Sequence, residues 1–248
     1  MIAAVLSFLL MWGAANLGKL LFARLQILAD KELEEFNLII GATLTLLGLI
    51  IGFAFSMAVG RYDQRKNYEE EEANAIGTEY VRADLLPAGD VVKVQALLRQ
   101  YLDLRVRFYE MSHRDDLPQL ASATAKLQNE MWSIVAADAR AQQTPVMTLV
   151  ASGMNDVLNR QGYTQAAWWN RIPVAAWALM VLIAICCNML VGAAAKDIGS
   201  KRNLIILPIV LAVAIMLLAD LDSPRGGIIR VHPQNLLSLL ESLGQPVR

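Results

Sequence analysis

The sequence predicts an all-α integral membrane protein with four transmembrane helices and a helical cytosolic insert between the second and the third. Two observations predict this fold class. Hydrophobic residues make up 56% of the 248 residues and charged residues 18%, whereas soluble domains average about 45–50% and about 25%. In addition, four apolar stretches approach the roughly 20 residues that a helix needs to cross a bilayer. The lipid bilayer is therefore the first expected partner.

The first two membrane helices are expected near the N-terminus. Residues 1–18 carry no charge before Lys19. A secretory signal peptide would begin with positive charge, so we interpret this stretch as a membrane helix. Residues 36–60 are also free of charge. Because residues 61–84 contain a single glycine and no proline, the second helix is expected to continue beyond the membrane as one long rod.

The segment of residues 61–170 is expected to be a bundle of helices. Apolar residues recur at three- and four-residue spacing in 91–111, and Asp90 is the expected cap of this helix. Another helix is expected from Leu117 towards Ala141. A further helix is expected after Thr144, because Thr caps helices and a proline follows at the first helical position.

Two more membrane helices follow, in residues 172–195 and 203–219, which are also uncharged. The tail contains an amphipathic segment at 235–243, which either docks another protein or packs on the chain's own cytosolic domain. The chain is thus expected to consist of a first membrane helix pair, a helical cytosolic domain, a second membrane pair and a cytosolic tail. The respective boundaries are 1–60, 61–170, 171–222 and 223–248.

Four crossings place both termini and the segment 61–170 on one side of the membrane. The short loops 19–37 and 196–202 then lie on the other side. Lys and Arg near the membrane ends are almost equally numerous on the two sides. The positive-inside rule therefore does not decide the orientation.

The composition and the polar residues argue against several functional classes. The net charge of −1 provides no basic excess for nucleic acid. His113 and His232 have no partner at ligand spacing, so no metal site and no cofactor are expected. No catalytic motif is found, so the protein is not expected to be an enzyme. The acidic run 69–72 is interpreted as a solvated helix turn rather than a cation site, because consecutive helix residues point in different directions.

Small residues form a stripe along the second membrane helix. They recur at spacings of four, three, four and four, at Gly41, Thr45, Gly48, Gly52 and Ser56. Such a stripe favours close helix packing, either against a neighbouring helix or between copies of the chain around a pore. In the second case the adjoining face, with Leu49 and Phe53 four residues apart, would line the pore. Apolar rings of this kind gate ions by dewetting.

Three short motifs resemble a known family. Residues 52–62, reading GFAFSMAVGRY, resemble the end of the second membrane helix of bestrophins. Residues 72–77 and the segment DLDSPRGG at 220–227 resemble bestrophin-like bacterial membrane proteins, whose last membrane helix is followed by Asp-x-Asp-x-Pro-x-x-Gly. The positions that match this ending are Asp220, Asp222, Pro224 and Gly227.

The resemblance implies a homopentameric ion channel in the bacterial cytoplasmic membrane, with a cytosolic helical domain and both termini in the cytoplasm. It also implies that Thr45, Leu49 and Phe53 line the pore neck, past which an inorganic ion permeates. Thr45 replaces a large apolar residue of the family, so the outer ring of the pore neck, which Thr45 would form, would be wider and more polar. The acidic calcium clasp of bestrophins is missing after the last helix, so calcium gating is not carried over.

Two other functions fit the same arrangement of helices. One is an energy-transducing subunit of the MotA/ExbB type, which shares two helices, a cytosolic helical insert and two more helices, and also forms pentamers. The other is a membrane-anchored scaffold without transport, which uses the 235–243 segment for docking. An ion channel is the preferred interpretation, because of the resemblance.

Overall fold

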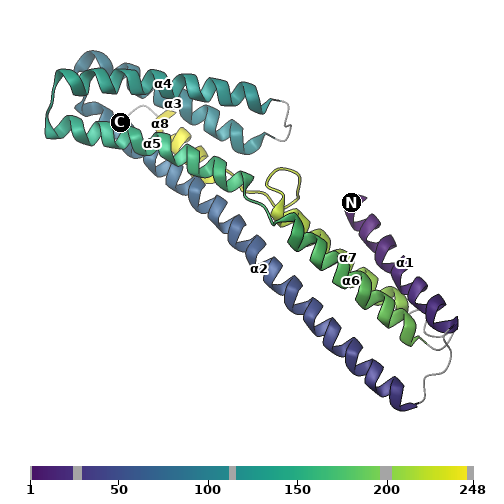
Figure 1. The fold of residues 1–248 in the computed structure, drawn as a ribbon. Coiled ribbons are helices and arrows are strands. Elements are labelled where there is room, and N and C mark those ends of the chain that lie inside the picture. The colour runs from purple at the N-terminus through teal and green to yellow at the C-terminus, as the bar shows by residue number, and fades with distance from the viewer. Residues whose placement is uncertain (1, 25–29, 112–115, 196–202, 245–248) are drawn as a thin grey trace. The chain divides into compact units, whose positions relative to one another are not determined.

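The computed structural model describes residues 2–24, 30–111, 116–195 and 203–244. Within these ranges the chain is helical, without strands, as the sequence predicts (Figure 1). The elements are α1 (Ile2–Arg24), α2 (Asp30–Arg82), η1 (Ala83–Leu85), α3 (Ala88–Glu110), α4 (Leu117–Ala141), α5 (Pro145–Trp169), α6 (Val174–Ala194), α7 (Asn203–Asp222) and α8 (Gln234–Gly244). The expected loop 196–202 and His113 lie outside the described residues.

The chain divides into two compact units. The first unit comprises Met1–Gly60 and Arg171–Ser223, and the second comprises Arg61–Asn170 and Pro224–Arg248. Four helical segments contain a stretch long and apolar enough to cross a membrane, namely Ala4–Leu21, Glu34–Leu85, Pro145–Ala194 and Leu204–Asp222. The prediction that the second helix extends far beyond its apolar part is confirmed, because α2 runs for 53 residues without a break.

The first unit is held together by the packing of α1 on both α6 and α7 (Figure 1). One cluster of buried hydrophobic residues in this unit consists of Met11, Leu47, Ala184, Cys187 and Leu211. Two glycines allow the closest approach between α1 and α6. A Cβ built at Gly18 would collide with the carbonyl oxygen of Met189, and one at Gly192 would collide with that of Ala15. Glycine is therefore required at both positions, which are reciprocal points of the same helix pair.

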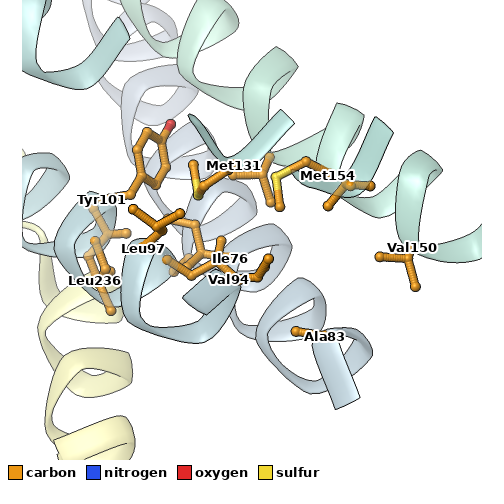
Figure 2. Close-up of a cluster of buried hydrophobic side chains, with 14 of the residues drawn as sticks. Ile76, Ala83, Val94, Leu97, Tyr101, Met131, Val150, Met154 and Leu236 are labelled. Carbon is orange, nitrogen blue, oxygen red and sulfur yellow. The ribbon is translucent and has the colours of Figure 1, made fainter. Parts of the chain in front are cut away.

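The second unit has its own hydrophobic core, to which all its helices contribute. Figure 2 shows Ile76 of α2, Val94 of α3, Met131 of α4, Met154 of α5 and Leu236 of α8 converging there. Leu236 is fully buried, and α8 presents further leucines to the same core. Of the two interpretations of the tail, packing on the chain's own domain is therefore confirmed.

The helix starts in the second unit agree with the sequence in one case and differ in another. Thr144 caps α5, because its Oγ1 accepts a hydrogen bond from the backbone N of Met147 at 3.3 Å. The prediction that Asp90 caps the next helix along the sequence is wrong. Helix α3 already begins at Ala88, and Asp90 lies within its first turn, where its carboxylate accepts a hydrogen bond from Lys93 at 2.8 Å. An acidic residue is favourable both at the N-cap and in the first turn of a helix, because the positive end of the helix dipole lies there.

Candidate functional site

Helix α2 in the first unit has one face that packs within the chain. Leu47, Ala54 and Ala58 are buried there. Leu44 and Ile51 are partly buried and pack against the hydrophobic cluster of the first unit. Their spacing of three and four residues follows the helix period, so these five side chains form a single stripe. This stripe fixes which face of α2 is left without a partner among the described residues of the chain.

The three residues expected to line a pore lie on the opposite face of α2. Thr45, Leu49 and Phe53 are all exposed, with 54% of Leu49 and 69% of Phe53 accessible. The four-residue spacing places one above the other on the helix surface. Thr45 donates its hydroxyl to the carbonyl oxygen of Gly41 at 2.9 Å. Its only donor is therefore bound by the helix itself, which makes this position less polar than the residue type suggests.

The small residues of α2 are open on the side next to these three. A Cβ built at Gly41, Gly48 or Gly52 would meet no other part of the described chain within 4 Å, and Ser56 is exposed. Within the described residues, this stripe therefore does not serve close packing against a helix of the same chain. Packing between copies stays the prediction for these four positions.

The residues after the last membrane helix divide between the two units. Asp222 is buried in the first unit, where its Oδ1 accepts a hydrogen bond from the backbone N of Ile172 at 2.9 Å. It therefore joins the end of α7 to the segment before α6. Asp220 is half-buried in the same unit, whereas Pro224 and Gly227 are buried in the second unit.

Arg225 lies between these motif positions and was not singled out by the sequence analysis. Its guanidinium lies 4.5 Å from the ring centre of Phe108 and 4.3 Å from that of Trp168. It also donates hydrogen bonds to the carbonyl oxygens of Phe108 at 2.8 Å and Met111 at 3.0 Å. A cation is thus held at the C-terminal end of α3, where the helix dipole favours positive charge.

The interpretation of the acidic run 69–72 as a solvated turn is wrong for two of its four residues. Glu69 is buried and accepts hydrogen bonds from the backbone N of Leu236 at 2.9 Å and from Asn235 at 2.6 Å. It thereby satisfies donors at the start of α8. Glu72 is fully buried and pairs with Arg105 at 2.5 Å. Their partners lie far away along the chain, so no local pattern indicates them.

The described residues contain no group of three or more His, Cys, Asp or Glu side chains that could hold a metal ion. Cys186 and Cys187 of α6 are free thiols, the first exposed and the second buried. The feature with the clearest functional meaning is therefore the unpartnered face of α2.

A scan against protein families matches residues 10–236 to the Bestrophin-like domain. A search of curated proteins finds no match. Among solved structures, the chain is similar to a crystal structure of a bacterial bestrophin homolog from Klebsiella pneumoniae, with 14% identity, 99% of each chain covered and a TM-score of 0.67. A single-site variant of that homolog gives 15% identity, 98% of each chain and 0.67. A structure described only as a membrane protein gives 15% identity, 99% of this chain, 100% of that chain and 0.68.

Proposed function

Because the chain belongs to the bestrophin-like family, we propose that it forms an oligomeric ion channel of the bestrophin type. In this proposal five copies surround a common axis, and inorganic ions pass along it, past Thr45, Leu49 and Phe53. The protein is an integral membrane protein. We place its helical domain and both termini in the cytoplasm of a bacterium, which the family resemblance favours.

The observation that carries the proposal is the unpartnered face of α2. One chain supplies a single α2, so a pore lined by this helix requires several copies arranged with cyclic symmetry. Open glycines at positions 41, 48 and 52 would let neighbouring helices approach closely. The exposed Leu49 and Phe53 would then form apolar rings at the axis, and such rings act as a gate by excluding water.

Ion flux from liposomes that contain the purified protein tests the proposal. Since the permeant ion is not specified, Na⁺, K⁺ and Cl⁻ gradients are each measured. We expect the wild type to conduct and Leu49→Ala/Phe53→Ala to conduct several-fold faster, because smaller side chains widen and wet the constriction. The matched control is Phe55→Ala, since Phe55 is also exposed but points about 200° away around the helix.

Two outcomes would reject the proposal. The first is the absence of flux from both the wild type and the double variant. The second is an equal gain of flux in Leu49→Ala/Phe53→Ala and Phe55→Ala, which would mean that the face carrying Phe53 does not line the path. A non-conducting complex that co-purifies with a single-helix partner would support the energy-transducing alternative instead.

A further inference from the structure

Glu79 is a buried carboxylate without a polar partner in the second unit. Its side chain is fully buried on α2, outside the apolar membrane stretch. Neither of its carboxylate oxygens has a hydrogen-bond partner among the described residues. Burying an unpaired charge is costly, so such a group takes up a proton instead.

The position of Glu79 depends on a glycine of the facing helix. A Cβ built at Gly153 of α5 would collide with Oε2 of Glu79 and would lie 2.5 Å from Nη1 of Arg82. The carboxyl group therefore occupies the space that any other residue at 153 would fill. Helices α2 and α5 therefore contact each other directly through Glu79 and Gly153.

The surroundings of Glu79 are charged on one side and apolar on the other. Arg82 of its own helix and Asp156 of α5 are the charged groups that act on it, with opposite effects on its proton affinity. Ile76 and Ala83, three residues before and four residues after Glu79, are fully buried in the apolar core of the second unit. Burial is the largest influence and raises the pKa of Glu79 to about 8.

A polar cavity lies beside the residues that surround this carboxyl group. Arg82, Gly153 and Asp156 line a polar cavity of about 360 Å³ between α2 and α5. Within the described residues, Glu71 and Arg160 at the rim of the cavity form an ion pair with each other. Arg82 is thus placed between the cavity and Glu79, where it can meet the carboxylate once the proton leaves.

We propose that Glu79 is a proton-binding site that controls the packing of α2 against α5. In the protonated form the neutral acid packs against Gly153 and the apolar core. In the ionised form the carboxylate turns towards Arg82 and the polar cavity, which separates the two helices at this point. The ligand is a proton, and the proposal does not depend on ion conduction.

The direction of the pH effect follows from the raised pKa. Between the usual value of 4.5 and about 8, the folded chain holds a proton on Glu79 that the unfolded chain has lost. The contribution of Glu79 to stability is therefore fully present below about 4.5, declines through this window, and is lost above about 8.

Two measurements on the full chain in detergent micelles test the proposal. The first is the infrared difference spectrum of the wild type between pH 6.5 and pH 9.5, in the region of protonated carboxylic acids. We expect a carboxylic acid band at pH 6.5 that disappears at pH 9.5. The second is the pH dependence of the melting temperature, which we expect to fall by several degrees between pH 5 and pH 8.

Two variants assign these signals. Glu79→Gln retains the shape of the neutral acid, so the band and the decline in melting temperature should both be lost. The control Glu70→Gln removes an exposed glutamate of the same helix and should keep both. A missing band in the wild type overturns the proposal, even if Glu79→Gln fails to fold. So does a variant Glu79→Gln that keeps the wild-type band and decline.

Discussion

Individual buried charges in the second unit are stabilised by partners far along the sequence. The ion pair of Glu72 and Arg105 is the clearest case, since only 0% and 2% of the two side chains are accessible. Glu72 also accepts hydrogen bonds from Tyr109 and Thr164, at 3.4 Å and 3.2 Å. Arg105, Tyr109 and Thr164 thus all donate hydrogen bonds to this carboxyl group.

Removal of one member of this pair should destabilise the protein strongly. Arg105→Met leaves the buried carboxyl group of Glu72 without its cation, and breaking a buried pair in this way costs about 3–5 kcal/mol. The control is Asp103→Asn, which removes an ion pair with Arg107 whose side chains are 44% and 64% accessible. An exposed pair contributes about 0–1 kcal/mol. Thermal unfolding in detergent should separate the two, and equal effects would contradict the role of burial.

For single residues, the sequence predicts which side chains share a helix face, because these follow a regular period. It does not predict which side chains bind residues far away along the chain. Thr45, Leu49 and Phe53 share one face because their spacing is that of a helix, and the structure places them there. Glu72 binds a residue 33 positions away, and Glu69 binds one 167 positions away. Neither distance leaves a trace in the local pattern, so both glutamates were interpreted as solvated.

Helices in the first unit are packed through glycines that no stripe in the sequence reveals. Gly18 follows Ala14 and Ala15, and Gly192 precedes Ala193 and Ala194, but only the two glycines mark the closest approach of α1 and α6. At the glycines of the conspicuous stripe of α2, a Cβ would meet no other helix of the described chain within 4 Å. Sequence periodicity therefore predicts where the helices lie, but not which of their glycines contact another helix.

Substitution at these contacts should weaken the helix pair. In Gly192→Ala the new Cβ would overlap the carbonyl oxygen of Ala15, which belongs to rigid backbone. Overpacking of this kind costs about 1–3 kcal/mol. The control is Gly13→Ala in α1, where a Cβ meets nothing within 4 Å, and a change within about 0.5 kcal/mol is expected. Unfolding in mixed micelles measures both, and an unaffected Gly192→Ala would contradict the close approach.

The whole assembly is the level at which the sequence alone is least informative. Helix content and membrane stretches follow from composition, because lipid demands long apolar helices. The number of copies does not, since small and apolar residues on a membrane helix suit contacts with lipid as well as contacts with another copy. The resemblance to bestrophins supplies the expectation of a pentamer, and the open face of α2 supplies a surface for it.

Enlarging a residue on that surface should change the oligomer without unfolding the chain. A Cβ at Gly52 meets no other part of the described chain within 4 Å, so Gly52→Leu adds bulk on the open side of α2 and would separate neighbouring copies in the proposed ring. We expect the oligomer to dissociate to smaller species in native mass spectrometry, while the melting temperature of the chain's helices stays close to that of the wild type. Val210→Phe, at an exposed position of α7, adds similar bulk and should leave the oligomer intact.

An unchanged oligomer in Gly52→Leu would show that the glycine face of α2 is not the contact between copies. Dissociation in Val210→Phe alone would instead assign the contact to α7. Either result would also remove the main support for a conduction path along α2.

The C-terminal segment has a consequence for the synthesis of the protein. Arg225 and Leu236 complete the packing of the second unit, yet both are translated after α6 and α7. Residues 61–170 therefore leave the ribosome without the guanidinium that binds the end of α3 and without the helix that closes their core. The second unit reaches its final fold only once α6 and α7 have been made, so a chain that ends before them leaves the core of this unit incomplete.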